Sequence, residues 1–240
     1  MKNRPVLWNG VRVPYGASVE ELARLVGGPA PQRWTAFVAL AHTPDDAALG
    51  VLEESARSRD PHVRRIAAAA IGVHPGGARL ASVVRALIAD TDAAVVRSAC
   101  DAAGQQRMLE VRDSVARLLE AKEVSTRIAA IRSIRELWKA TDFEPVFDAY
   151  LHDSSEHVQR EAAWTLRATV SASTWHRLFR AWHVDPLPRH RVWACEIALA
   201  YGDSDVLRDL RRLTGDVDGH VRLRARQVVT ALEQRHSRED

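Results

Sequence analysis

Residues 60–72 read Asp-Pro-His-Val-Arg-Arg-Ile-Ala-Ala-Ala-Ala-Ile-Gly, and this stretch decides the fold. Asp60 is suited to cap a helix, and Pro61 fits the first helical position because its missing N–H would have no partner there. Apolar or small residues follow Val63 at intervals of four, seven and eight, so they form one stripe along a helix. The small alanines in this stripe allow a neighbouring helix to pack closely.

The same pattern returns along the chain at nearly constant spacing. Successive anchor residues are 32, 31, 32, 33 and 30 positions apart: Val63, Val95, Thr126, Val158, Arg191 and Val221. A period of this length fits one helix pair per repeat. The helices that carry the anchors are called second helices here, and first helices are expected at 45–58, 77–90, 108–121, 143–152, 173–183 and 204–214. A capping box at Ser18 predicts an earlier pair at 19–26 and 31–42.

The sequence therefore predicts an all-α fold, an α-solenoid of about seven antiparallel helix pairs. The signature Asp-x-x-Val-Arg-x-x-Ala-x-x-Ala-(Ile/Leu)-Gly at 60–72, echoed at 92–104 and 218–229, resembles HEAT repeats. It is similar in particular to the short HEAT-like repeats associated with phycobilin lyases. The resemblance covers about residues 31–235 and implies a superhelix whose second helices line the concave, partner-binding face. It specifies no function, because such repeats serve scaffolds, adaptors and a few enzymes.

Three segments are expected along the chain. Asn9-Gly10 lies between two β-prone runs, which predicts a hairpin. We expect residues 1–17 to form this hairpin as a cap over the first helices, or alternatively as a docking element for a partner. Residues 18–235 form the solenoid, and 236–240 a frayed tail.

Composition excludes several classes of protein. The chain has 240 residues, of which 46% are hydrophobic and 27% charged, as in a folded protein rather than a disordered one. The net charge of +3 is too small to indicate nucleic-acid binding by itself. Cys100 and Cys195 are expected on helices three repeats apart, too distant for a disulfide. No apolar run is long enough to span a membrane and no signal peptide is evident, so we expect a cytoplasmic protein.

Arginines and tryptophans gather on one flank of the second helices. Counted from Asp60, positions five, nine and twelve lie beside the buried stripe and should be exposed. The candidate partner-binding residues there are Arg65, Arg97, Arg132, Arg135, Arg160, Trp164 and Arg167, with Trp193 added if Arg191 is the sixth anchor. Arginine pairs bidentately with carboxylates, and tryptophan provides a large contact surface. This combination predicts a non-catalytic adaptor or scaffold that binds a protein or an acidic peptide.

Other residues at repeated positions have a structural interpretation. Arg64, Arg127, Arg191 and Arg222 occupy the consensus arginine position, where HEAT-like repeats commonly pair with an acid of a neighbouring repeat. His62, His157, His190 and His220 also recur, but adjacent copies are about one repeat apart, too far for shared metal coordination. No cofactor or metal is expected.

A nucleic-acid-binding protein is the alternative hypothesis. Alkylpurine DNA glycosylases built from HEAT-like repeats are similar in length and use a basic groove with tryptophans and a carboxylate. The residues of this chain that are similar in kind are Arg97, Asp101, Arg132, Arg135, Trp164 and Trp193. No stretch of the chain matches that family position by position. Enzymatic activity is therefore left open, with a non-catalytic role favoured.

Overall fold

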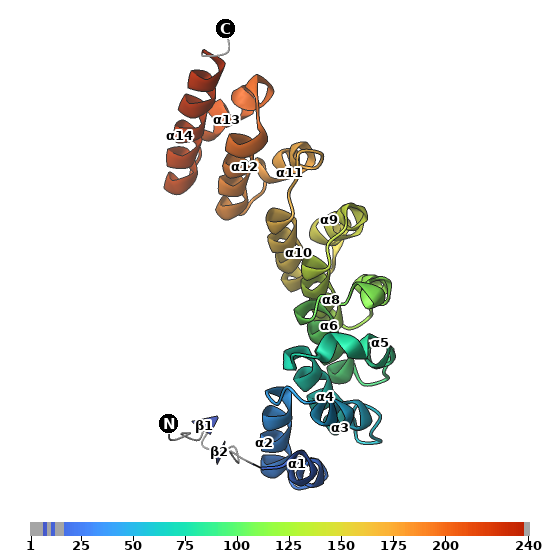
Figure 1. Ribbon diagram of the computed structural model, residues 1–240. Coiled ribbons are helices and arrows are strands. Elements are labelled where there is room, and N and C mark those ends of the chain that lie inside the picture. Colours follow the sequence, from blue (N-terminus) through green and yellow to red (C-terminus); the bar gives the residue numbers. More distant parts are fainter. Residues whose placement is uncertain (1–6, 9–10, 13–16, 238–240) are drawn as a thin grey trace, which may run out of the picture. The chain divides into compact units, whose positions relative to one another are not determined.

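The computed structural model describes residues 7–8, 11–12 and 17–237. Within these residues, fourteen α-helices follow one another as seven consecutive pairs (Figure 1). The predicted all-α helical repeat is thereby confirmed. The chain divides into two compact units, Met1–Thr165 (unit 1) and Leu166–Asp240 (unit 2).

The helices of unit 1 follow the predicted order closely. Its first helices are α1 (Val19–Val26), α3 (Asp46–Ser55), α5 (Ala81–Ile88), α7 (Arg112–Ala116) and α9 (Phe143–His152). Its second helices are α2 (Ala30–Ala41), α4 (Pro61–Val73), α6 (Ala93–Gln105) and α8 (Val124–Glu136), followed by α10 (Glu156–Ala168), which crosses into unit 2. Short 3₁₀ turns lead into α5, α7 and α9. Ser18 forms the predicted capping box with Glu21.

Unit 2 contains the last two pairs. They are α11 (Trp175–Trp182) with α12 (Pro188–Tyr201), and α13 (Leu207–Leu213) with α14 (Gly219–His236). α12 and α14 pack directly against each other. Among the described residues, no helix has both the length and the apolar character required to cross a membrane.

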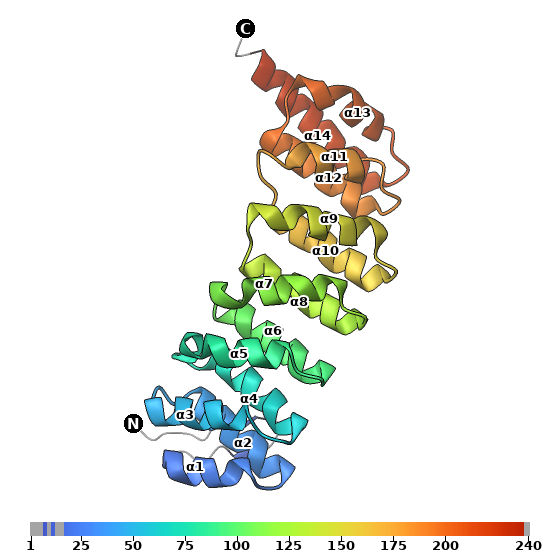
Figure 2. The same cartoon turned by 90° about the vertical axis from the view of Figure 1, so that its right-hand side faces the viewer.

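In unit 1 the second helices form one layer and the first helices another. α4, α6 and α8 lie side by side, and α3, α5 and α7 line up on the other layer (Figures 1 and 2). The anchors Val63 and Val95 are buried, and the alanines four residues later, Ala67 and Ala99, are completely enclosed. The predicted stripe is therefore the hydrophobic seam of this unit.

Two glycines have a different role from the one that the sequence suggests. Gly202 is expected as a left-handed residue at a helix end; it does end α12, but its φ is −76°. Gly72 and Gly104 are expected in the same role. Instead both lie inside their helices, α4 and α6, and neither has a positive φ. A Cβ on Gly72 would lie 3.0 Å from the Cα of Ala102, and a Cβ on Gly104 would lie 3.2 Å from the Cα of Ser133. Each glycine therefore permits close approach of the next second helix.

The left-handed residue at the end of α6 is Arg107. Its φ is +50°, and among the described non-glycine residues no other φ is positive. The N–H of Met108 donates to the carbonyl of Ala103 (2.9 Å), as in a helix-terminating Schellman motif. An L side chain costs about 1 kcal/mol in this conformation. The arginine side chain is exposed, so no side-chain packing offsets this backbone strain.

Replacing Arg107 by glycine is therefore expected to stabilise the protein. The Arg107→Gly variant should gain about 0.5–1 kcal/mol in the free energy of unfolding, because strain is relieved at a position where glycine is preferred. Urea denaturation followed by circular dichroism measures this change. A lower midpoint with an unchanged m-value would contradict the assignment of strain to Arg107.

The N-terminal segment is described only in part. Leu7–Trp8 (β1) and Val11–Arg12 (β2) pair as antiparallel strands, with Leu7 opposite Arg12. The connecting Asn9-Gly10 and the flanking residues 1–6 and 13–16 lie outside the described residues. The predicted hairpin cap over residues 1–17 therefore remains a prediction.

Both cysteines are buried and unpaired. Burial raises the pKa of each thiol to about 12, so neither is a reactive thiolate at neutral pH. The sequence interpretation of Cys100 and Cys195 as small hydrophobic residues agrees with this environment.

Candidate functional site

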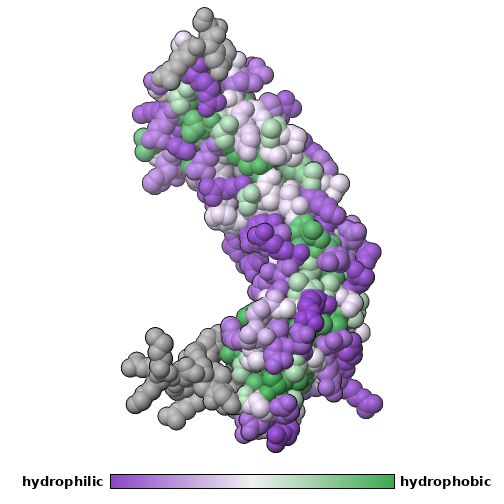
Figure 3. Space-filling model, in the orientation of Figure 1, coloured by the Kyte–Doolittle hydropathy of each residue, from purple (hydrophilic) through white to green (hydrophobic). Residues whose placement is uncertain are grey.

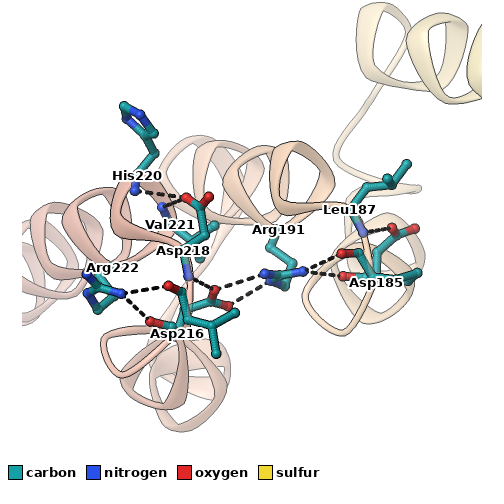
Figure 4. Close-up of polar contacts among 10 residues, drawn as sticks. Asp185, Leu187, Arg191, Asp216, Asp218, His220, Val221 and Arg222 are labelled. Atoms are coloured by element: carbon teal, nitrogen blue, oxygen red, sulfur yellow. Dashed lines mark hydrogen bonds and ion pairs between the residues drawn. The ribbon is translucent and has the colours of Figure 1, made fainter.

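A ladder of arginine–aspartate pairs joins one repeat to the next. The Arg64 side chain donates from Nε and Nη2 to Asp90 at 2.7 and 2.9 Å, and its Nη1 donates to the carbonyls of Ser58 and Arg59. Arg127 repeats this geometry with Asp153, and Arg191 with Asp216 (Figure 4). The predicted role of these three arginines is confirmed.

Each aspartate of the ladder also fixes its own loop. One oxygen accepts the N–H of the residue two positions later, at 2.8–2.9 Å in all three cases: Asp92 for Asp90, Ser155 for Asp153, and Asp218 for Asp216. The aspartate is thus part of a tight Asx turn. One carboxylate holds both the neighbouring arginine and the start of the next second helix.

Each arginine–aspartate pair is called a rung of the ladder, and one rung lacks both of its residues. Val96 occupies the arginine position of α6, and Ala121 occupies the corresponding aspartate position, 25 residues later. Losing both partners leaves no unpaired charge, whereas losing one would. Within unit 1, Gln159 also replaces an arginine and keeps only the contact to its own loop, the carbonyl of Asp153 at 2.8 Å.

Arg222 differs from the other consensus arginines. Its pairing with an acid was predicted, but no described carboxylate lies within ion-pair distance of it. Its Nη1 donates to the carbonyls of Asp216 and Val217 at 2.7 and 3.0 Å (Figure 4). The predicted acid pair is therefore wrong for this residue.

The ladder makes stability depend on acid pH. Hydrogen bonds from the paired arginines lower the pKa values of Asp90, Asp153 and Asp216. In the unfolded chain an aspartate titrates near pH 3.9. Between that value and the lower folded pKa, the unfolded state binds more protons, so stability rises with pH there. The contribution is complete above about pH 5 and is lost as the pH falls through the folded pKa values.

We therefore expect the urea midpoint to be flat from pH 7 to about pH 5 and to fall below about pH 4. Removing one complete rung, by Arg127→Val with Asp153→Ala, should make that fall shallower. Urea titrations of both proteins at a series of pH values measure the difference. An identical acid dependence in the two proteins would show that the ladder is not its source.

The exposed flank of α4, α6 and α8 forms an open pocket of about 410 Å³. It is lined by three of the predicted arginines, Arg65, Arg97 and Arg132, together with Asp101 and Ser125. The repeat spacing puts these side chains together, because each second helix adds a residue to the same flank. The count from the start of each repeat that selects the arginines also places Asp101 on this flank. Ser125 comes before the first counted position of its repeat, so the pattern does not select it.

The three arginines of the pocket differ in how far they are neutralised. Arg132 pairs with Glu161 of α10 at 3.0 Å. Arg97 donates to the Ser125 hydroxyl at 2.9 Å, and Arg65 lies 3.5 Å from the Nδ1 of His62. Neither Arg65 nor Arg97 has an ion pair with any residue in the described part of the chain. Two guanidinium groups therefore remain available to a ligand.

Asp101 is the one acid of the pocket lining. Burial raises its pKa, while the charges of Arg132 and Arg97 act in the opposite direction. Neither arginine forms an ion pair with it in the described structure. Its carboxylate can therefore accept hydrogen bonds from a ligand, and it would repel a second negative charge placed directly over it.

The other candidates of unit 1 lie outside the pocket. Arg135, one turn after Arg132, pairs with Glu136 at 3.3 Å. On α10, Arg160 is exposed and Trp164 is 45% exposed. Because Glu161 of α10 contacts Arg132 of α8, these two residues extend the same flank within unit 1.

Two candidates belong to unit 2, and one of them is misplaced by the sequence analysis. Trp193 is expected on the exposed flank but is only 6% exposed and packs edge-on against Trp182, with ring centroids 5.5 Å apart. The reason is register: the buried His190, not Arg191, takes the anchor position. Arg167 lies over the Trp193 ring at 5.0 Å and pairs with Glu196 at 2.9 Å.

In the view of Figure 3, hydrophilic residues are interspersed with several groups of hydrophobic residues. Within the described residues, no group of three or more histidine, cysteine or acidic side chains is placed to hold a metal ion. The distinctive chemistry of the flank is thus that of arginine.

Comparisons with known proteins identify the fold but not the family. No family model matches the chain, and no curated protein matches it. The YibA protein of Escherichia coli is 15% identical and matches over 90% of this chain and 93% of its own, with a TM-score of 0.61. An engineered protein is 20% identical over 90% of this chain and 68% of its own, with a TM-score of 0.56.

A chain in a homology model of the full-length AP-3 complex is 15% identical over 89% of this chain and 51% of its own, with a TM-score of 0.55. At such low identities these likenesses show the fold alone. Fold and comparisons together define a stacked helical-repeat protein. Membership in the HEAT family remains a prediction.

Proposed function

We propose that this chain is a cytoplasmic, non-catalytic adaptor of the HEAT-like type. It holds an acidic segment of a partner protein on the exposed flank of α4, α6 and α8. Arg65 and Arg97 bind carboxylates of that segment, and Arg160 and Trp164 of α10 extend the contact.

The contrast between two sets of arginines carries the proposal. Arg64, Arg127 and Arg191 are each held by an aspartate and two carbonyls, and they serve the fold. Arg65 and Arg97 have no acidic partner within the described structure and line a pocket. Arginines without a structural acid partner, gathered on one face, are suited to bind carboxylates from outside.

An acidic peptide fits this pocket better than nucleic acid does. Asp101 lies among the arginines, and Glu161 already neutralises Arg132. Continuous phosphates would meet these two acids, whereas a peptide places carboxylates only at chosen positions. A peptide also brings backbone N–H groups, from which the carboxylate of Asp101 can accept hydrogen bonds.

Charge reversal of the two unpaired arginines tests the proposal. A fluorescein-labelled peptide of alternating aspartate and glycine should bind the wild type in low salt. The Arg65→Glu/Arg97→Glu variant should bind it at least about tenfold more weakly, since two charge-assisted contacts are lost. Fluorescence anisotropy measures both affinities, and circular dichroism verifies the fold.

Arg117→Glu/Arg180→Glu is the matched control, because it changes the net charge equally at exposed positions on the first-helix side. If the control weakens binding as much, the attraction is non-specific and the assigned flank is wrong. Short duplex DNA forms a third arm. Tighter binding of the duplex than of the peptide, lost in the Arg65/Arg97 variant, would favour the nucleic-acid alternative and refute the peptide adaptor.

A further inference from the structure

The three complete rungs show how this fold builds a carboxylate receptor. In each, Nη1 of the arginine is held by two carbonyls of its own loop at 2.7–3.1 Å. That contact fixes the guanidinium plane and turns the Nε–Nη2 edge toward the next repeat. Nε and Nη2 then donate to the two carboxylate oxygens of one aspartate, at 2.7 Å from Nε and at 2.8–2.9 Å from Nη2.

Arg222 of α14 has the first half of this arrangement without the second. Its Nη1 is held by the carbonyls of Asp216 and Val217 at the same distances as in the complete rungs. No described residue offers a carboxylate to its Nε–Nη2 edge. The side chain is therefore already positioned for a bidentate contact, and little conformational entropy remains to be lost on binding.

The neighbouring surface of α14 is mixed: Leu223 is 59% exposed, and a further positive charge lies one turn along the same helix. At the place where the other second helices bury a small or aliphatic side chain, α14 carries the exposed Arg226. The buried counterparts are Ala68, Cys100, Ile131, Ala163 and Cys195. A further hydrophobic helix packed here would have to bury the guanidinium of Arg226. The positive charge of Arg226 instead complements an acidic segment.

We infer that the Nε–Nη2 edge of Arg222 is a second binding site, which receives an aspartate side chain from a partner protein. The complete rungs specify the form of that segment. Each ladder aspartate stands in an Asp-x-Asp or Asp-x-Ser turn, whose following N–H occupies one carboxylate oxygen. The occupant is thus an acidic turn segment, and Arg226 adds a second positive charge beside it.

The chain itself provides the test peptide. Residues 89–94, Ala-Asp-Thr-Asp-Ala-Ala, contain the turn that fills the Arg64 rung, and the blocked peptide can be added to the full-length protein. The readout is the ¹⁵N-edited signal of the arginine Nε–H groups. The Arg222 signal should shift in a saturable manner, while those of Arg64, Arg127 and Arg191 should not, because their edges are occupied.

Two variants make the result specific. Arg222→Lys keeps the charge but removes the planar fork, and should weaken peptide binding at least about fivefold. Arg226→Lys is the matched control and should change the affinity less than twofold. A peptide whose first aspartate is replaced by asparagine should not shift the Arg222 signal.

Three outcomes would overturn the inference. One is an Arg222 signal that does not move at tens of millimolar peptide. Another is an equal response to the asparagine peptide. The third is concentration-dependent self-association of the protein that is abolished by Arg222→Lys, because the occupant would then be a second copy of this chain.

Discussion

Asp153→Ala is expected to lower the free energy of unfolding by about 3 kcal/mol. The side chains of Asp153 and Arg127 are 8% and 11% exposed, so the arginine left behind would be a poorly solvated charge. The same change also removes the acceptor for the N–H of Ser155. Because the loop lies near the surface, water can partly reach the orphaned group, which keeps the effect at the lower end of the range for buried pairs.

The double variant Arg127→Val/Asp153→Ala should be less destabilised than Asp153→Ala alone. Val96 and Ala121 occupy the same two positions in a neighbouring repeat, so the fold already tolerates a rung with both partners absent. A cycle of the wild type, two single variants and the double variant, measured by urea denaturation, gives the coupling energy. Additive single effects would refute the ladder as a coupled pair.

The second large effect is expected at a glycine. Gly77 is buried at the start of the turn that leads into α5, and a Cβ there would collide with the carbonyl oxygen of Ile71. It would also lie 2.9 Å from the side-chain amide of Gln106. That amide lies 2.8 and 2.9 Å from the carbonyls of Gly72 and His74, where it caps the end of α4. Gly77→Ala should therefore cost about 2–3 kcal/mol through overpacking against backbone and loss of this cap.

Gly50→Ala is the control of opposite sign. Gly50 is exposed in the middle of α3, with nothing within 4 Å of an added Cβ. Alanine there should stabilise the protein by about 0.5–1 kcal/mol. Thermal denaturation of the two variants measures the contrast. A Gly77→Ala protein as stable as the wild type would show that the close approach between the turn and α4 is not required.

The repeat period made most of the fold predictable. An apolar anchor followed by alanine four residues later defines a helix seam by local spacing alone, and each of the six predicted anchors lies within a second helix. The roles of Gly72 and Gly104 are not local, because a glycine at a helix end and a glycine under a crossing helix look alike in sequence. Only the approach of the neighbouring helix distinguishes them.

The candidate site was predictable to a smaller extent. The helical count places Arg65, Arg97 and Arg132 on one flank, and the structure brings them together. The helical count does not reveal that Glu161 neutralises Arg132 or that Glu136 pairs with Arg135, since these contacts depend on side-chain rotamers. Trp193 was misplaced because a buried histidine at an anchor position breaks the apolar pattern, and a one-residue error moves a side chain to another face of the helix.

Photo-crosslinking of an acidic peptide shows which face of unit 1 the peptide occupies. The aspartate–glycine peptide, carrying a benzophenone group, is bound to the wild type, irradiated and mapped by mass spectrometry. We expect crosslinks to α4, α6 and α8 around Arg65 and Arg97, and their loss in the Arg65→Glu/Arg97→Glu variant. Crosslinks concentrated on the first helices α5 and α7, or unchanged by the variant, would contradict this expectation.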